Sequence, residues 1–348
     1  MKITKAILLS FTIFVIAFSF RFYSVAKASE QSGIVVMEKI SERVLYSENA
    51  DLKLPMASTT KIVTAITVID NFNIENIVEV PSDFKGVEGS SIYLRPNEKY
   101  SVKDLLYGLM LRSGNDSAEI LASSFCSRVE FIKLMNETAK KCKASNTNFT
   151  NPHGLHDENH YTTAEDLAKI TCYALKNETF KSIVSAKKHV ATELSSGEKR
   201  YWQNKNKMLF NFDGATGVKT GYTVKAGRCL VSSAQRNGME IICVVLNVYD
   251  MFERSKFLLS NAFEEFKLVK LFSKDKFNYK IPDENLNYYD LYAEKDFYYP
   301  LSKNDKIHIE LNLPKCIKKP SSSQEKIGEI KIYTQKQLIF CQNIYTLI

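Results

Sequence analysis

Three short strings of residues carry the groups that a serine-dependent acyl transfer requires. They are Ser58-Thr59-Thr60-Lys61, Ser113-Gly114-Asn115 and Lys219-Thr220-Gly221, in that order along the chain. A serine three residues before a lysine also occurs at six other places, so the first string alone indicates only a helix cap and a surface lysine. Lys-Thr-Gly occurs once. The prediction therefore depends on the three strings together.

Ser58 and Lys61 fit a nucleophile and its base. A serine hydroxyl is a weak nucleophile at neutral pH and needs a base within hydrogen-bond reach. Residues i and i+3 of a helix lie on one face, so a helix that begins at Ser58 places the lysine amine beside the hydroxyl. The lysine can act as a base only if its pKa falls, and burial or a second cation such as Lys219 would lower it.

The other two strings supply proton transfer and substrate binding. The Ser113 hydroxyl can donate and accept, which suits a relay of the proton to a leaving amine. The Asn115 amide matches the C=O and N–H of a bound peptide. Lys219 and Thr220 present a charge and a hydroxyl suited to a substrate carboxylate.

Two backbone features complete the predicted site. Gly221 has no side chain, which would let a substrate backbone approach closely. The backbone amides of Ser58 and Tyr222 are the predicted oxyanion hole, and the start of a helix adds a positive dipole end where anionic charge develops.

The middle of the chain is predicted to be helical. Apolar residues on nearly every side of residues 62–69 indicate a buried helix that begins at or just before Ser58. Ser101 and Asp104 resemble a capping box for a helix that ends near Ser113, which places Ser113 on a bend between helices. Further amphipathic stretches predict helices over 116–125, 130–142 and 163–175.

Strands flank this helical part on both sides. The predicted strands cover residues 34–37, 44–46, 218–223, 229–236 and 239–248. Asn237-Gly238 between the last two indicates a tight hairpin, because both residues tolerate positive φ. A helix over about 253–266 follows. Strands, then helices, then strands indicate an α+β fold with an antiparallel sheet.

The sequence predicts two domains behind a cleaved leader. Its 348 residues, of which 45% are apolar and 25% charged, suffice for two hydrophobic cores. Residues 1–28 fit a secretory signal with cleavage after Ala28, and their uncharged run over 6–20 is shorter than the about 20 residues of a spanning helix. A retained membrane anchor is the alternative. We expect a catalytic domain over 29–268 and a small all-β domain over 269–348, in an exported, extracytoplasmic protein.

Charge excludes one class of partner. Residues 1–28 hold four cations and no acid, so cleavage lowers the formal net charge from +8 to +4 (8 − 4). No Lys/Arg run is interleaved with aromatic residues on the scale of a nucleic-acid groove, so nucleic-acid binding is not expected. In the β domain, residues 306–313 alternate with period two, which predicts a strand.

All seven cysteines lie beyond residue 28. Export permits disulfides, and Cys316 with Cys341 is the one pairing proposed for test. Cys229 and Cys243 lie in apolar, strand-like runs and are predicted to be buried thiols. There is no Cys-x-x-Cys zinc spacing.

A histidine-rich segment leaves a metal site as an alternative. His153, His156 and His160 lie near Asp157 and Glu158, and histidine and carboxylate both bind zinc. Their spacing matches no metallopeptidase signature, so a polar loop beside the site is the favoured interpretation and no metal is expected.

Longer stretches around these strings resemble one known family. They are Ala57-Ser58-Thr59-Thr60-Lys61, Asn151-Pro152-His153-Gly154-Leu155, and residues 212–227 around Lys219-Thr220-Gly221-Tyr222-Thr223. Over about residues 33–266, and more loosely beyond, the chain resembles a low-molecular-mass penicillin-binding protein, a serine-type D-alanyl-D-alanine carboxypeptidase of the S11 peptidase kind. The resemblance implies a β-lactamase/transpeptidase-like domain with a helical subdomain, followed by a small all-β domain.

The resemblance also implies a reaction. Ser58 would attack the penultimate D-alanine carbonyl of a peptidoglycan stem pentapeptide, the terminal D-alanine would leave, and water would hydrolyse the acyl-enzyme. β-Lactams would be covalent inhibitors, and no cofactor is implied.

The chain departs from the family pattern in two places. A family arginine that helps hold the terminal carboxylate aligns with Met251, so Arg254 is predicted to bind the carboxylate, with Arg228 as the alternative. The family's C-terminal amphipathic membrane-binding helix has no counterpart in residues 343–348, which leaves membrane association open.

Three other functions are alternatives to the carboxypeptidase. A β-lactamase needs a deacylating base, and Glu165 and Asp166 lack the Glu-x-x-x-Asn arrangement of class A enzymes. A DD-endopeptidase would use the same acyl-enzyme. A non-catalytic wall-binding protein would use the β domain, but the intact strings argue against it.

Overall fold

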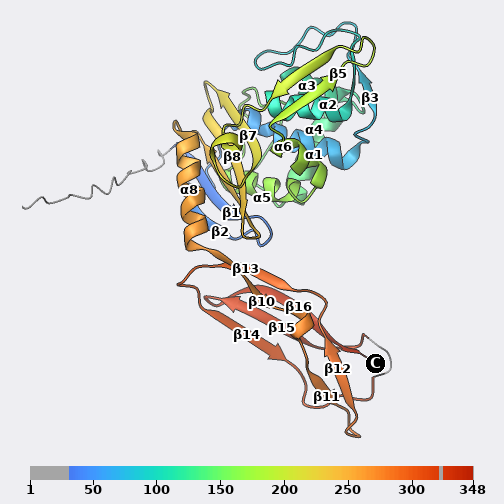
Figure 1. Ribbon diagram of the computed structural model, residues 1–348, viewed down its shortest axis with the longest axis vertical. Coiled ribbons are helices and arrows are strands. Elements are labelled where there is room, and N and C mark those ends of the chain that lie inside the picture. The colour runs from blue at the N-terminus through green and yellow to red at the C-terminus, as the bar shows by residue number, and fades with distance from the viewer. Residues whose placement is uncertain (1–30, 321–323, 348) are drawn as a thin grey trace, which may run out of the picture.

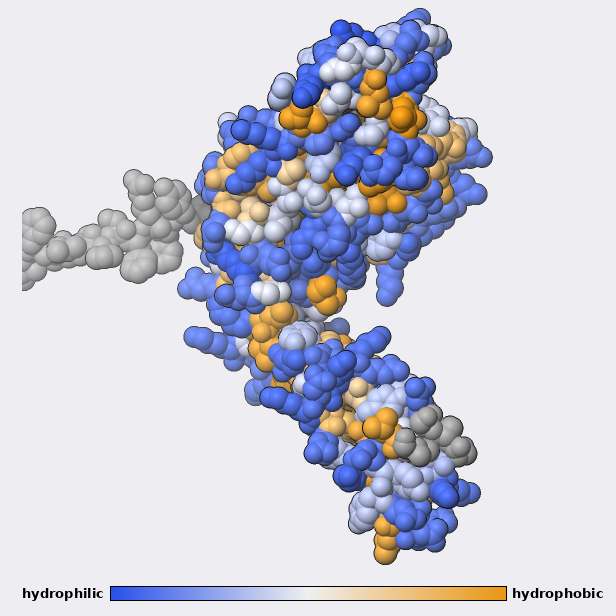
Figure 2. Space-filling model, turned by 45° about the vertical axis from the view of Figure 1, so that its right-hand side comes forward, coloured by the Kyte–Doolittle hydropathy of each residue, from blue (hydrophilic) through white to orange (hydrophobic). Residues whose placement is uncertain are grey.

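The protein has two lobes of different construction. The computed structural model describes residues 31–320 and 324–347, and the predicted signal peptide over residues 1–28 lies outside them. Figure 1 shows a first lobe of mixed helices and strands, coloured from blue to the orange of its last helix, and a second, elongated lobe of strands, coloured orange to red. Figure 2 shows that the visible face of both lobes is mostly hydrophilic.

Within the described residues, nineteen elements make up the first lobe. They are β1 (Gly33–Glu38), β2 (Val44–Glu48), the 3₁₀-helix η1 (Ala57–Thr60), α1 (Lys61–Asn71), β3 (Ile77–Glu79), β4 (Lys99–Ser101), α2 (Val102–Tyr107), the π-helix η2 (Gly108–Arg112), α3 (Asn115–Ser123), α4 (Arg128–Lys141), α5 (Ala164–Ala174), α6 (Glu178–Ser185), β5 (Lys188–Thr192), β6 (Lys199–Gln203), α7 (Met208–Asn211), β7 (Ala215–Thr223), β8 (Gly227–Arg236), β9 (Met239–Leu246) and α8 (Met251–Glu265). The second lobe holds β10 (Lys267–Phe272), the 3₁₀-helix η3 (Lys274–Lys276), β11 (Lys280–Pro282), β12 (Tyr288–Tyr292), β13 (Phe297–Leu301), β14 (Ile307–Asn312), β15 (Lys326–Thr334) and β16 (Gln337–Leu347).

An antiparallel five-stranded sheet forms the centre of the first lobe, in the order β2-β1-β9-β8-β7. Because side chains alternate across a strand, β1 buries Val35 and Met37 in the core beneath α1 and α5, and Ile34 and Val36 in the core beneath α8. Helices therefore cover both faces, as Figure 1 shows. The predicted α+β fold is confirmed.

The tight hairpin between β8 and β9 is also confirmed. Asn237 and Gly238 have φ values of 49° and 81°, and Arg236 pairs with Met239 across the turn. Strand β7 pairs with β8 on one side only, which places it at the edge of the sheet.

The helix predicted near Ser58 begins as a 3₁₀ turn at Ala57 and continues as α1. Its residues 61–68 are all buried, which explains why β-branched residues with weak helix propensity are helical here. Burial of Ile62 and Ile66, both fully buried, contributes about 1.5–3 kcal/mol each. Packing thus fixes α1 at the centre of the lobe.

The helix predicted from Ser101 has the serine half of the predicted capping box and the expected end, whereas the Asp104 carboxylate pairs with His189. The Ser101 side chain accepts a hydrogen bond from the Asp104 amide. After the π-helical turn of η2, Ser113 takes a left-handed conformation with φ 65°, and α3 begins at Asn115. Ser113 therefore lies on a bend. The short elements β3, β4, α6, α7 and the β5–β6 hairpin were not predicted.

The second lobe contains a sheet in the order β11-β12-β16-β15-β14 and the separate β10–β13 pair.

Arg43 of the first lobe contacts the second lobe. It makes a 2.8 Å ion pair with Asp305 and donates a 2.6 Å hydrogen bond to the Pro300 carbonyl. The guanidinium also lies over the Phe266 and Tyr299 rings. The predicted boundary after residue 268 falls within β10, and its position stays a prediction.

The cysteines predicted to be buried and the two proposed to pair differ in their exposure to solvent. Cys229 and Cys243 are buried, and burial raises the pKa of each thiol to about 12. The proposed pairing of Cys316 with Cys341 is wrong: both are exposed free thiols. Cys316 precedes Ile317, which forms a parallel β-bridge with Asp283. Cys341 lies on β16, where it pairs with Lys331 of β15.

In the described part of the chain, no helix combines the length and the apolar character needed to cross a bilayer.

Candidate active site

Ser58 and Lys61 lie side by side at the start of the central helix. The Lys61 Nζ atom is 3.0 Å from the Ser58 Oγ atom, the contact expected from their i, i+3 spacing. Ser58 is half-buried at the surface of the lobe, whereas Lys61 is fully buried. The serine can therefore meet a ligand while the lysine is shielded from bulk water.

The Lys61 amine has two further partners, both from distant parts of the chain. It donates to the Asn115 Oδ1 atom at 2.7 Å and to the His153 carbonyl at 2.6 Å. Both partners are oxygen atoms that only accept hydrogen bonds. Two of the amine's hydrogens are therefore directed away from Ser58.

Burial and charge change the proton affinity of the two buried lysines. Burial lowers the pKa of Lys61 well below 10.5, and the nearby positive charge of Lys219 lowers it further. Burial likewise lowers the pKa of Lys219 to about 7, assisted by the charge of Lys205. Both effects on Lys61 favour its neutral amine, the form that can act as a base.

Lys205 adds a positive charge near the site that the sequence did not reveal. It follows β6, and its positive charge lowers the pKa of both Lys61 and Lys219. Its amide donates to the Leu111 carbonyl, which holds it beside the turn that carries Ser113. In the sequence Lys205 is a single lysine between two asparagines, a pattern that indicates no particular function.

The second string forms a bend, and its Asn115 side chain contacts Lys61. Ser113 is 5% exposed, in its left-handed conformation. The Asn115 Nδ2 atom donates to the Glu88 carbonyl at 2.5 Å while Oδ1 accepts from Lys61. The amide predicted to bind substrate is thus already engaged by the chain and orients the lysine.

The third string lies on the edge strand β7. Lys219 is buried and donates to the Thr220 carbonyl, whereas Thr220 is half-buried. A Cβ atom on Gly221 would lie 3.0 Å from the Ser58 amide nitrogen and 3.2 Å from the Met56 carbonyl oxygen. The glycine therefore admits the protein's own backbone, where the sequence predicted close approach of a substrate.

The 151–155 loop packs against the start of the Ser58 helix and contacts Lys61. The Asn151 Oδ1 atom accepts from the amides of His153 and Gly154, which shapes the turn. Gly154 has φ 92°, and a Cβ atom there would lie 1.9 Å from the Ala57 carbonyl oxygen. The loop thus presses against η1 and delivers the His153 carbonyl to Lys61.

The histidines of this region have separate partners. The His153 side chain pairs with Glu119 at 3.0 Å, His156 with Glu158 at 2.9 Å, and His160 with the Thr60 hydroxyl at 2.8 Å. Burial lowers the pKa of His160 to about 3, so this ring is neutral. Among the described residues, no three His, Cys, Asp or Glu side chains gather into a potential metal site.

Arg254 is held at the β2 edge of the sheet, opposite the β7 edge that carries Lys219, so its predicted role is corrected. It is buried on α8 and binds Glu48 at 2.5 Å and the Tyr46 hydroxyl at 3.1 Å, both on β2. Strand β2 forms the sheet edge opposite β7. The alternative, Arg228, is exposed on β8 directly opposite Tyr222, with its guanidinium 4.9 Å from the Tyr249 ring centre.

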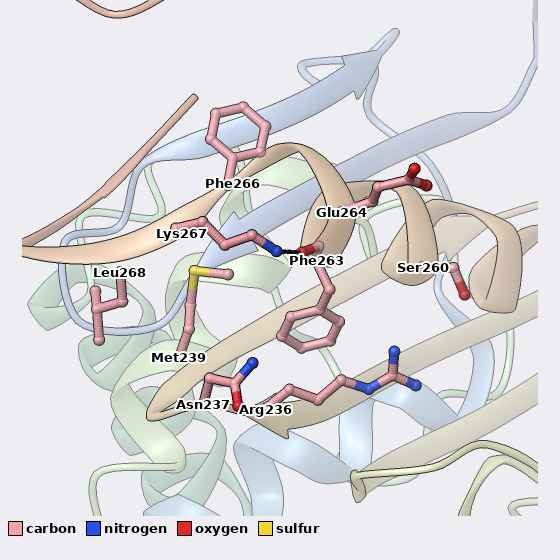
Figure 3. Close-up of a pocket in the computed structure, with 9 residues that line it drawn as sticks. All are labelled: Arg236, Asn237, Met239, Ser260, Phe263, Glu264, Phe266, Lys267 and Leu268. Atoms are coloured by element: carbon pink, nitrogen blue, oxygen red, sulfur yellow. Dashed lines mark hydrogen bonds between the residues drawn. The ribbon is translucent and has the colours of Figure 1, made fainter. Parts of the chain in front are cut away.

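A pocket of about 360 Å³ on the α8 side of the molecule contains none of the predicted site residues. Figure 3 shows Arg236 from the β8–β9 hairpin beside Phe263 of α8, with the Lys267 amine bonded to the Phe263 carbonyl. Ser58 lies across the sheet, so this pocket is separate from the site.

A serine beside a buried, neutralisable lysine, at the edge of an antiparallel sheet, defines a serine hydrolase of the acyl-enzyme type. Residues 23–250 match the D-alanyl-D-alanine carboxypeptidase family, and residues 266–347 match the C-terminal domain of penicillin-binding protein 5. The chain belongs to the D-alanyl-D-alanine carboxypeptidase family.

Individual relatives agree with this assignment. The D-alanyl-D-alanine carboxypeptidase DacF of Bacillus subtilis is 32% identical over 259 residues, which is 72% of this chain and 66% of DacF. The D-alanyl-D-alanine carboxypeptidase of Streptomyces sp. K15 is 37% identical over 219 residues, 58% of this chain and 75% of that protein. Penicillin-binding protein 5 from Haemophilus influenzae superposes with a TM-score of 0.74 at 27% identity, covering 93% of this chain and 98% of that one.

Proposed function

We propose that this protein is a serine-type carboxypeptidase that removes the terminal D-alanine from peptidoglycan stem pentapeptides. Ser58 attacks the carbonyl of the penultimate D-alanine, the bond to the terminal D-alanine breaks, and water then hydrolyses the Ser58 ester. β-Lactams, which present a strained amide to the same serine, would acylate it and inhibit the enzyme. Family membership and the position of Ser58 support the proposal.

The hydrogen-bond partners of Lys61 carry the proposal. A neutral lysine amine has two hydrogens and one lone pair. Asn115 Oδ1 and the His153 carbonyl can only accept, so they take the two hydrogens. The lone pair is then left for the third neighbour, the Ser58 hydroxyl at 3.0 Å. Lys61 is thereby oriented to receive the serine proton as the hydroxyl attacks.

Nearby groups would transfer the proton that Lys61 has received and would stabilise the negative charge that develops on the substrate carbonyl oxygen. We assign to Ser113 the transfer of the proton to the departing amine, since its hydroxyl lies on the bend next to Asn115. The amides of Ser58 and Tyr222 are our candidates for the oxyanion hole. The close approach of Gly221 to the Ser58 amide supports this pairing, because it brings the two segments together.

Thr220 and Arg228 are our candidates for holding the terminal carboxylate. Thr220 and Tyr222 lie two residues apart on β7 and share a face, and Arg228 is the cross-strand partner of Tyr222. Arg228→Gln should raise KM for D-Ala-D-Ala peptides with a smaller effect on kcat. An unchanged KM would remove Arg228 from the site.

Two measurements test the reaction. Fluorescent penicillin followed by peptide mapping should label Ser58, and Ser58→Ala should abolish labelling. Ser82→Ala is the matched control, because Ser82 also precedes a lysine by three residues but is exposed outside the site. A label on another residue would overturn the assignment.

Mass analysis of products from defined muropeptides then identifies the bond. Release of D-alanine from a pentapeptide, lost in Ser58→Ala, is the expected result. Cleavage only of cross-linked dimers would indicate an endopeptidase, and rapid turnover of penicillin a β-lactamase. Equal muropeptide binding by both variants, with no product from either, would indicate a wall-binding protein.

A further inference from the structure

A pocket of about 470 Å³ lies between the β5–β6 hairpin and the loop that precedes Glu98. Two tyrosines on its rim, Tyr93 and Tyr201, are 80% and 75% exposed. Exposed apolar side chains that gather at one pocket are a feature of binding surfaces. No step of the proposed reaction uses this surface, which we call the tyrosine platform.

The platform is held rigidly, although its rings are exposed. Tyr93 has φ 60°, a conformation unfavourable for a bulky residue. The buried Asp116 carboxylate fixes the backbone on either side by accepting from the amides of Ile92 and Leu94. From the other side, Arg200 donates to the carbonyls of Ile92 and Tyr93. Several hydrogen bonds thus fix the backbone segment whose Tyr93 ring is exposed to solvent.

The charges around the platform are balanced. Arg95 pairs with Glu98 at 2.7 Å and with Glu198 at 2.5 Å. Arg200 pairs with Glu98 at 2.6 Å. Two guanidinium groups thus face two carboxylates, so the surface has no excess charge to attract an anionic or a cationic ligand. It offers ring faces surrounded by hydrogen-bond donors and acceptors, which suits a neutral ligand with both C–H faces and hydroxyl groups.

The platform adjoins the active site through one layer of side chains. A Cβ atom on Gly114 would lie 3.2 Å from the Ile92 side chain, and one on Gly108 would lie 3.3 Å from Trp202. Ile92 and Trp202 both line the pocket. Gly114 lies between Ser113 and Asn115, and Asn115 contacts Lys61. A ligand on the platform is therefore close to one bound at Ser58.

We propose that the tyrosine platform binds the amino sugar that carries the stem peptide. The inference rests on the proposed function. In that substrate the sugar lies about four residues from the reacting carbonyl, and four extended residues span at most about 14 Å. The sugar's carboxyl group is tied up in the link to the peptide, so the ligand is neutral, as the balanced charges require. Binding of this remote part would raise kcat/KM for sugar-bearing substrates.

Comparison of two substrates tests the proposal. The wild-type protein should have a higher kcat/KM for a disaccharide-pentapeptide than for the same pentapeptide without sugar. Tyr93→Asn, which suits positive φ, and Tyr201→Thr, which suits a strand, should each lower that preference about five- to tenfold. Both variants should cleave the bare peptide and react with penicillin at wild-type rates. Tyr288→Ala is the matched control, since Tyr288 is a 65% exposed tyrosine of the second lobe.

The outcomes separate this inference from the proposed function. A wild-type enzyme without preference for the sugar, or variants that keep the preference, would overturn the platform. If neither substrate releases D-alanine, the proposed reaction fails, and binding of the peptide-free disaccharide, followed by NMR on the tyrosine ring signals, still tests the platform. Ring signals of Tyr93 and Tyr201 that do not shift with the disaccharide would then refute it.

Discussion

Gly154→Ala tests whether the 151–155 loop sets the catalytic geometry. The new Cβ atom would lie 1.9 Å from the Ala57 carbonyl oxygen and 2.5 Å from its carbon, so backbone must move. A left-handed conformation costs a non-glycine residue about 1–2 kcal/mol. Overpacking of a filled site adds about 1–3 kcal/mol. We therefore expect a loss of about 2–5 kcal/mol in the free energy of unfolding.

The same displacement should damage the reaction. Ala57 precedes the nucleophile, and the His153 carbonyl beside Gly154 holds the Lys61 amine at 2.6 Å. A shift of about 1 Å between reacting groups costs on the order of 100-fold in rate. We expect the second-order rate of penicillin acylation to fall by about that factor, measured with a fluorescent penicillin under conditions where the variant is folded.

Gly197→Ala separates strain from displacement. Gly197 has φ 76°, but a Cβ atom there would meet no atom within 4 Å. This control should lose only about 1–2 kcal/mol and keep its acylation rate. Urea unfolding of both variants gives the free energies. If Gly154→Ala is no less stable than the control and acylates as fast as wild type, the loop does not position the site.

Three further predictions follow from charges. Lys205→Gln removes a charge that lowers the pKa of Lys61 and Lys219, so the acid limb of the acylation pH profile should move to higher pH. An unmoved limb would contradict this coupling. Folding lowers the pKa of Lys219 from 10.5 to about 7, so the folded state binds fewer protons between these values. The resulting destabilisation is complete below about pH 7 and disappears toward pH 10.5; urea unfolding should show wild-type stability rising relative to Lys219→Met over this range. Arg43→Met leaves the buried Asp305 carboxylate without its ion-pair partner. The free energy of unfolding in urea should fall by up to about 3 kcal/mol, with no change in penicillin acylation. A slower acylation would show that the second lobe supports the site.

Local spacing was enough to predict the Ser58–Lys61 pair, because residues three apart in a helical turn must meet. The same reasoning could not find the other partners of Lys61, since Asn115 and His153 are 54 and 92 residues away in the chain. Their positions depend on how loops pack against α1. Gly221 shows a related limit: its lack of a side chain was recognised, but the backbone that it admits belongs to another segment.

The sequence itself contained evidence against the predicted carboxylate-binding role of Arg254. Arg254, Leu258 and Ala262 are spaced four apart, so one face of the predicted helix carries them all. Leu258 and Ala262 are buried against the sheet, and Arg254 must follow them inward. Helical periodicity therefore argued against a role at the opposite edge of the sheet, where β7 lies.

The charge state of Lys61 decides more than the supply of a base. Because Asn115 Oδ1 and the His153 carbonyl are fixed acceptors, a protonated Lys61 must give its third hydrogen to the Ser58 oxygen. That bond would occupy a lone pair of the attacking oxygen and oppose its attack. Loss of one proton reverses the bond, so Ser58 becomes the donor. Burial and the Lys219 charge, which lower the Lys61 pKa, therefore set the direction of the Ser58 hydrogen bond and with it the reactivity of the oxygen.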